Sequence, residues 1–151
     1  MSRSRAVLLA ALVGSCGPSA ASYEVDLTLE TRCITRAGVE SCDAPAGERM
    51  TSTLSIEPRG DAVLLQLGDQ LFVTGATSAE LAATRTVETR HDDSGCQSRS
   101  VHQLSLQQGW GEVSGGYSEQ ETTEGPSGAC GQTPYGERRS YQLTGTEITD
   151  L

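Results

Sequence analysis

Four cysteines carry the most definite chemistry in this chain. Cys33, Cys42, Cys96 and Cys130 form an even set, and no two of them have the Cys-x-x-Cys spacing of zinc knuckles and redox-active dithiols. In an oxidising compartment such a set predicts two structural disulfides, although four cysteines allow three pairings. Metal binding by these thiols is the weaker alternative.

The tripeptide His91-Asp92-Asp93 is the most polar cluster that contains an imidazole. A metal site there would need further ligands from elsewhere in the chain, and the sequence indicates none. A solvated hairpin tip accounts for the motif. We therefore expect no metal site and retain Asp92 and Asp93 only as candidate binding residues.

Motifs of enzymatic catalysis are missing from the sequence. The chain contains no nucleophile elbow, phosphate-binding loop or metalloprotease helix motif. Serines and acidic residues are numerous, but no constellation singles any of them out as catalytic. We expect a protein without enzymatic activity and without a cofactor.

The first sixteen residues have the pattern of an export signal. Arg3 and Arg5 precede the apolar run Ala6–Val13, which is too short to cross a bilayer, since a spanning helix needs roughly 20 apolar residues. The motif Val13-Gly14-Ser15-Cys16 resembles the lipobox of bacterial lipoproteins. That resemblance implies removal of residues 1–15 and a diacylglycerol on the thiol of Cys16.

The resemblance also implies an address in the cell envelope. Gly17, rather than an aspartate, follows the cysteine, which in lipoproteins of this type implies the outer membrane. The alternative is an ordinary signal cut after Ala21, which would discard Cys16 and release a secreted or periplasmic soluble protein. A cytosolic helix is disfavoured, because no polar face interrupts the apolar run.

The size and charge of the exported part limit its function. Removing residues 1–15 from the 151-residue chain leaves 136 residues, which suits a lipidated Cys16 with a short tether to residue 22 and one domain over residues 23–151. Two of the eleven basic residues lie in the leader, so the remainder carries nine basic and 20 acidic side chains, a formal charge of −11. Such a surface repels nucleic acid, which we exclude as a partner.

The domain reads as a succession of short strands. Tyr23, Val25, Leu27 and Leu29 alternate with polar residues, the period-two pattern of a half-buried strand. Similar segments and tight turns follow, whereas Thr35–Gly47 reads as a loop. The sequence predicts eight strands, namely Tyr23–Ile34, Met50–Glu57, Ala62–Leu67, Leu71–Gly75, Ala83–His91, Cys96–Gln107, Gly111–Thr123 and Arg138–Thr149.

This pattern predicts an all-β fold, an antiparallel up-and-down meander that closes into a small barrel. A two-sheet β-sandwich is the alternative. The pattern is similar to the calycin-like barrels of lipocalins. Those carry a Gly-x-Trp motif on the first strand, whereas Trp110 lies in a later turn of this chain, so no lipocalin site is transferred to it.

A meander determines which connections share an end of the barrel. All four cysteines fall in or beside the first, fifth and seventh connections, which lie at one end, while both chain termini lie at the other. This favours the pairs Cys33–Cys42 and Cys96–Cys130. The same end would hold a loop surface for binding, with Asp92, Asp93, Glu124 and Tyr135 as candidate contributors.

The short loop between the fifth and sixth predicted strands sets their register and places Arg85 opposite His102. Leu104 and Leu106 share a face with His102, so both basic residues should point inward. Two such groups require a carboxylate partner or an anionic ligand. The alternatives are a slipped register or a pair in water at the open rim.

Ser114-Gly115-Gly116-Tyr117 resembles, with one residue fewer, the Ser-Gly-x-x-Tyr loop of periplasmic lysozyme inhibitors. That family consists of small disulfide-bearing barrels, and the resemblance implies an inhibitor of an envelope enzyme. A glycine-kinked barrel strand is the alternative interpretation.

The sequence therefore favours a non-catalytic, lipid-anchored envelope protein that binds a partner through its disulfide-tied loop surface. The partner is an unknown envelope protein or a small ligand. The alternatives are a carrier of a small anionic or apolar ligand inside the barrel and an inhibitor of an envelope enzyme.

Overall fold

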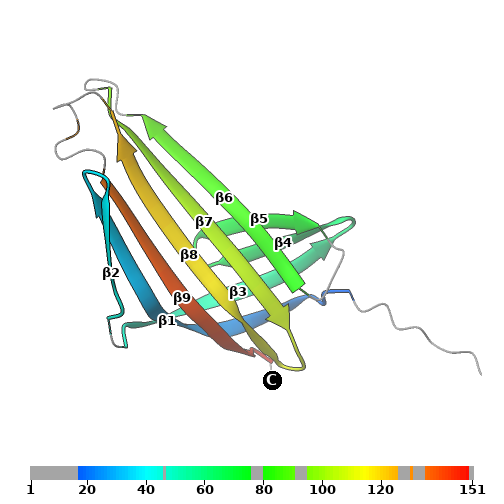
Figure 1. Ribbon diagram of the computed structural model, residues 1–151. Coiled ribbons are helices and arrows are strands. Elements are labelled where there is room, and N and C mark those ends of the chain that lie inside the picture. Colours follow the sequence, from blue (N-terminus) through cyan, green and yellow to red (C-terminus); the bar gives the residue numbers. More distant parts are fainter. Residues whose placement is uncertain are drawn as a thin grey trace, which may run out of the picture.

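In the part of the chain that the computed structural model describes, all regular structure is β-strand, arranged in one antiparallel sheet (Figure 1). The structure describes residues 17–45, 47–75, 80–90, 95–125, 130 and 135–149. The strands are β1 Ala21–Arg36, β2 Val39–Asp43, β3 Arg49–Arg59, β4 Ala62–Leu67, β5 Gln70–Gly75, β6 Glu80–Arg90, β7 Gln97–Gln108, β8 Glu112–Glu124 and β9 Tyr135–Glu147.

Eight strands follow one another around a nearly closed barrel. Their spatial order is β5-β4-β3-β1-β9-β8-β7-β6, so the first strand of the chain pairs with the last. This confirms the predicted up-and-down meander, and the sandwich alternative was wrong. Closure between β1 and β9 removes two edges that an open sheet would leave unpaired.

The remaining seam of the barrel lies between β5 and β6, the two ends of the hydrogen-bonded order. Side chains bridge it: the Thr74 hydroxyl donates to the carbonyl of Ala82 over 2.7 Å, and the Arg85 guanidinium donates to the side-chain carbonyl of Gln70. The barrel is therefore closed by a ladder at β1 and by side-chain contacts at the seam.

Strand β2 lies inside the segment predicted to be the loop Thr35–Gly47, so that prediction was wrong in part. The two residues of its turn, Ala37 and Gly38, have positive φ angles of 49° and 81°. A two-residue hairpin turn with this geometry is usually signalled by Asn-Gly or Asp-Gly. Alanine seldom adopts a positive φ, which explains why the sequence did not reveal the hairpin.

The alternation of β1 changes at a β-bulge between Leu29 and Thr31. Before the bulge the odd-numbered residues face the core, and after it the even-numbered ones do. Arg32 consequently pairs with Arg139 on the inner face, whereas Cys33 is on the outer face of the sheet, where it is buried opposite Cys42 of β2.

The inward side chains of the short strands and of the adjoining halves of the long ones form one apolar core. Each fully buried aliphatic or aromatic side chain contributes roughly 1.5–3 kcal/mol. The fully buried set is Tyr23, Val25, Leu54, Ile56, Val63, Leu65, Phe72, Leu81, Leu104, Leu106 and Leu143.

Two inward glycines let neighbouring strands approach closely. A Cβ on Gly115 would lie 1.9 Å from the Ser105 carbonyl oxygen, and one on Gly145 would lie 2.5 Å from a methyl carbon of Val25. The segment Ser114–Tyr117 lies within strand β8 and not in a loop.

The two ends of the barrel differ. At one end the start of β1 meets the end of β9, because the amide of Ile148 donates to the carbonyl of Ser22 over 2.7 Å. We call this the tether end; β1 already begins at Ala21, so the predicted tether to residue 22 is shorter than expected. Strands β3, β4 and β5 are confined to this half, and β3 pairs with β1 only up to Thr28.

At the opposite end β1, β2 and β6 to β9 continue alone as a trough, which we call the open end (Figure 1). Both disulfides belong to it, with the predicted pairs Cys33–Cys42 and Cys96–Cys130. Strand β9 begins there at Tyr135, earlier than predicted, and β6 begins at Glu80 rather than at Ala83. The described residues include no helix with the length and apolarity needed to span a membrane.

Candidate functional site

Five ionisable side chains form a row across the inner surface of the trough. Each residue is the cross-strand partner of the next, so the row crosses five adjacent strands, β6, β7, β8, β9 and β1. We call it the charged row, and its members in that order are Arg85, His102, Glu119, Arg139 and Arg32.

A layer of aromatic side chains separates the charged row from the apolar core. Tyr117 and Tyr141 are buried cross-strand partners whose rings stack with centroids 5.7 Å apart. Their hydroxyls contact the Glu119 carboxylate, at 3.4 and 3.5 Å. The Tyr117 hydroxyl also lies 2.9 Å from Nδ1 of His102, so the layer ties the imidazole to the carboxylate.

Arg139 joins two glutamates. Its Nη1 lies 3.2 Å from Oε1 of Glu119, and its Nε and Nη2 lie 2.7 and 2.6 Å from Oε1 of Glu137. Glu137 also accepts hydrogen bonds from Nε of Arg32 and from the hydroxyl of Tyr135, each at 2.9 Å. Two arginines and a tyrosine thus converge on one carboxylate.

These contacts shift the pKa values of the groups involved. Burial raises the pKa of Glu137, but the hydrogen bonds from Tyr135, Arg139 and Arg32 outweigh it, and the pKa lies below its usual value. Burial raises the pKa of Tyr117 well above 10, and the charge of Glu119 adds to the effect. The pKa of Tyr141 is raised by the same two causes. At neutral pH Glu137 is therefore ionised, and Tyr117 and Tyr141 are neutral.

Arg85 differs from the other arginines of the charged row. Its register opposite His102 and its position on the inner face are as predicted from the loop length. Glu119 lies on the strand beyond His102, but its ion pair is with Arg139, and no described contact joins it to Arg85. Within the described residues Arg85 bonds only the neutral amide of Gln70 and has no ion pair.

A hollow of about 190 Å³ lies over the middle of the charged row. Typical sites for drug-sized ligands have about 300–1,000 Å³, so this one suits a small anion or a single partner side chain. Its wall consists of Ser100, His102, Glu119, Gln120, Glu121, Glu137 and Arg139.

Of the other residues predicted from the sequence, some belong to the site, some lie apart from it and some are not described. Tyr135 belongs to the site, because its hydroxyl binds Glu137. Glu124 is exposed at the end of β8, opposite Gln97, and no described contact links it to the charged row. Asp92 and Asp93, like Cys16, lie outside the described residues.

The sequence did not indicate Arg32, Glu119, Glu137 or Arg139 as site residues. Glu119 follows Tyr117 on the inward alternation of β8, so extending that alternation beyond the core would have found it. Glu137 and Arg139 follow in the same way from Tyr141 on β9. Arg32 has no such signal, because the bulge reverses the faces before it.

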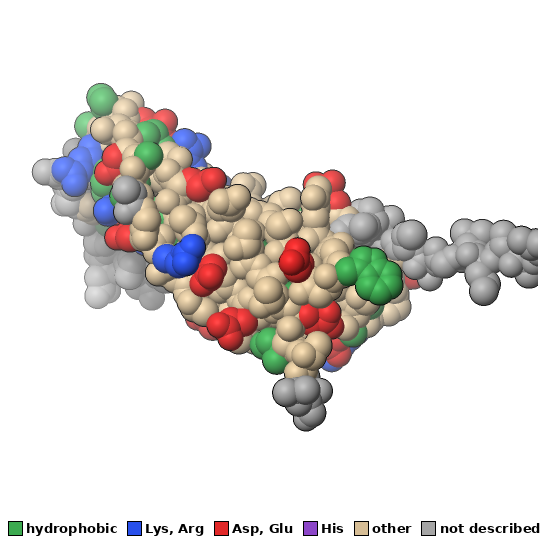
Figure 2. Space-filling view, turned by 90° about the horizontal axis from the view of Figure 1, so that it is seen from below, with side chains coloured by type: hydrophobic (Ala, Val, Ile, Leu, Met, Phe, Trp, Pro, Cys, Tyr) green, Lys and Arg blue, Asp and Glu red, His purple; other side chains and the backbone are tan. Residues whose placement is uncertain are grey.

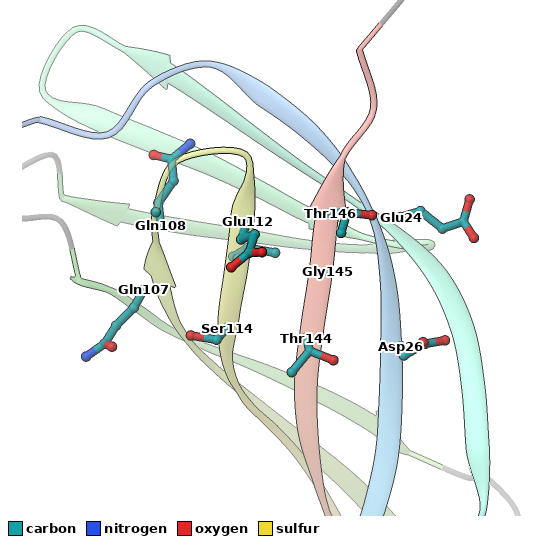
Figure 3. Close-up of a pocket in the computed structure, with 11 residues that line it drawn as sticks. Glu24, Asp26, Gln107, Gln108, Glu112, Ser114, Thr144, Gly145 and Thr146 are labelled. Atoms are coloured by element: carbon teal, nitrogen blue, oxygen red, sulfur yellow. The ribbon is translucent and has the colours of Figure 1, made fainter.

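A second hollow, of about 560 Å³, lies on the outer surface across β7, β8, β9 and β1 (Figure 3). It is lined by Glu24, Asp26 and Glu112 together with hydroxyl side chains such as Ser114 and Thr144, and by no basic residue. Seen from below, the molecule has red acidic side chains scattered over a largely tan surface (Figure 2). This outer groove is a solvated acidic face and carries no functional argument.

One trio in the described residues has metal-ligating atoms within 4.8 Å of one another, namely Cys33, Glu40 and Cys42. The two sulfurs form a disulfide, so neither is the thiolate that a metal would require. The Glu40 carboxylate is instead 3.3 Å from Arg138. This trio gives no support to metal binding by the thiols.

The geometry of the site, rather than a known relative, indicates its chemistry. No protein-family model matches this chain, and no curated protein matches it. The charged row and the tyrosines beside it combine ion pairs, neutral phenol groups and partly exposed arginines in an open trough. Such an arrangement can bind a group of complementary charge without any bond being made or broken.

Proposed function

We propose that this protein is a non-catalytic, lipid-anchored protein of the cell envelope that binds its partner at the open end of the barrel. The observation that carries the proposal is the charged row, which crosses the inner surface of the trough on five adjacent strands. A lipid on Cys16 would hold the tether end at the outer membrane and direct the charged row away from it. A secreted or periplasmic soluble form is the alternative.

The exposure of the row supports a binding role. The side chains of Arg32 and Arg139 are 41% and 39% exposed although both are paired, so a partner's carboxylate can reach them without breaking the existing bonds. The disulfides and ion pairs hold these groups in place before binding, which lowers the entropy cost of association. Complementary charge then provides specificity and a fast approach.

The chemistry of the row favours binding over catalysis. The Tyr117 hydroxyl lies 2.9 Å from Nδ1 of His102. Its raised pKa makes it a poor nucleophile at neutral pH, because the phenolate is disfavoured by burial and by Glu119. The carboxylate of Glu137 is held by two arginines, which lowers its basicity.

A specific observation favours a second candidate, the carriage of a small anionic ligand. Within the described residues Arg85 has a neutral amide as its only polar partner, and His102 lies opposite on the next strand. A carboxylate or similar anion in the adjoining hollow would complete the charge balance there. This role needs no protein partner. The enzyme-inhibitor alternative rests on the motif Ser114–Tyr117 alone, and no geometric argument adds to it.

A capture experiment distinguishes these roles. The chain from Gly17 onwards, immobilised and exposed to solubilised cell envelopes, is compared with an Arg32→Ala, Arg139→Ala variant, and bound proteins and small molecules are identified by mass spectrometry. We expect one protein retained by the native chain and lost from the variant. The matched control is Glu112→Ala, on the outer surface, which should retain it.

Loss of a small anion upon Arg85→Ala, with no protein difference, would favour the carrier. Identical captures by the native chain and the Arg32→Ala, Arg139→Ala and Arg85→Ala variants would overturn the assignment of function to the charged row.

A further inference from the structure

Trp110 is the only tryptophan of the chain, and its side chain is fully exposed. It lies in the turn between β7 and β8, which is closed by a hydrogen bond of 2.9 Å from the amide of Gly109 to the carbonyl of Glu112. An indole exposes roughly 150–250 Å² of largely apolar surface, so this placement costs free energy in water unless something covers it. Trp110 lies outside the open end and takes no part in the binding proposed there.

A clasp joins this turn to the N-terminal segment. The side-chain amide of Gln108 accepts from the backbone amide of Ser19 and donates to its carbonyl, both at 3.0 Å. The same amide group donates to the hydroxyl of Tyr23 over 2.8 Å, which anchors the clasp to the core. Gln108 is the last residue of β7, so Ser19 is held beside the strand that leads into the turn.

The N-terminal segment that follows Cys16 lies beside the turn that holds Trp110. Gly17, Pro18 and Ser19 line one hollow together with Trp110 and Gly111. Cys16 directly precedes Gly17, and three residues span at most about 11 Å. A lipid on Cys16 therefore brings the bilayer surface within about 11 Å of the clasp, at the level of the indole.

We propose that Trp110 inserts into the headgroup region of the phospholipid bilayer that holds the Cys16 lipid. The inference rests on the proposed lipid anchor. Tryptophan favours this interface, where its ring is shielded from water and its N–H still finds hydrogen-bond acceptors. The indole is then a second point of attachment, in addition to the acyl chains on Cys16. The clasp fixes the position of one relative to the other. The open end then points away from the membrane.

The surroundings define which lipid surface fits. Ile148 adds a second exposed apolar side chain at the tether end, where its amide binds Ser22. The neighbouring carboxylates of Glu112 and Glu147 repel anionic headgroups. The contact is therefore one with a zwitterionic surface.

The single tryptophan makes the test direct, because its fluorescence reports this position alone. The lipidated protein is reconstituted into phosphatidylcholine vesicles with and without brominated acyl chains. We expect a blue-shifted emission that the brominated lipid quenches. The Cys16→Ser protein, mixed with the same vesicles, should emit as in water.

A matched control moves the probe to the other end of the barrel. Val39 is exposed on β2, and a Val39→Trp, Trp110→Ser variant carries its only tryptophan there. We expect no quenching in that variant. Quenching of both proteins would mean that the barrel lies flat on the bilayer and would overturn the inferred orientation.

Different results would disprove the lipid anchor on Cys16 and the membrane contact of Trp110. Unquenched Trp110 in a protein whose Cys16 carries lipid by mass spectrometry would overturn this inference and leave the anchor intact. A mature protein without lipid would overturn both.

Discussion

The Glu119 carboxylate of β8 and the Arg139 guanidinium of β9 face each other across the inner surface, with Oε1 and Nη1 3.2 Å apart. Below this pair lie Tyr117 and Tyr141, whose hydroxyls contact the carboxylate. Above it lies Glu137, bound by the same arginine. The pair thus connects the buried core of the barrel to its open end.

Replacing Glu119 tests the strength of this connection. Both side chains are about a third exposed, so Glu119→Gln should lower the free energy of unfolding by no more than about 1 kcal/mol. Glu112→Gln, on the outer surface, is the control and should have almost no effect. Urea unfolding of the three proteins measures both values. Equal transition midpoints would mean that the pair contributes nothing to stability.

The pH dependence of stability should identify Glu137. Its pKa in the folded protein lies below the ordinary value of 4.5, so its ionised form stabilises the fold above that pH. This contribution is lost as the pH falls through the folded pKa. The native protein should therefore exceed Glu137→Gln in stability at pH 7, and the difference should shrink below about pH 5. A constant difference from pH 7 down to acid unfolding would contradict this assignment.

Adjacent glycines in β8 provide a matched pair for testing the strand packing. Gly115→Ala would place a Cβ 1.9 Å from the carbonyl oxygen of Ser105, so β7 and β8 must separate, at a cost of about 1–3 kcal/mol or more. Gly116→Ala meets nothing closer than 3.7 Å and should change stability by at most about 0.5 kcal/mol. Thermal unfolding distinguishes the two. Similar losses in both variants would refute the close approach at Gly115.

The two disulfides should contribute unequally. Their sequence separations are 9 and 34, and the loop-closure relation gives ~2.6 kcal/mol for Cys33–Cys42 and ~3.8 kcal/mol for Cys96–Cys130. Paired Cys→Ser variants measured by chemical unfolding provide the comparison. Peptide mapping should recover both pairs from the native protein, and free thiols under oxidising conditions would disprove them.

Lipidation is tested by Cys16→Ser. We expect this change to abolish acylation and leave an uncut or soluble form, because the thiol is the acceptor of the diacylglycerol in lipoproteins with this motif. Mass spectrometry of the N-terminal peptide and detergent partitioning measure the outcome. A native mature protein that begins at Ser22 and carries no lipid would refute the anchor and support plain export.

Local patterns in the sequence determined the strands other than β2, their order and one register. The alternation in each segment and the tight turns between segments specify an antiparallel meander. The length of one hairpin loop places Arg85 opposite His102, and the parity of the connections brings the four cysteines to one end. These features depend only on residues that are close in the chain or on counting strands.

Only the tertiary structure decided the rest of the site. The bulge after Leu29 turned Arg32 inward, and no residue type at that point indicates a bulge. The meeting of Arg32 with Arg139 and Glu137 depends on the pairing of β1 with β9, more than a hundred residues apart along the chain. No turn fixes the register of that pairing. It is set by the closure of the whole barrel around its core, which no local pattern of the sequence encodes.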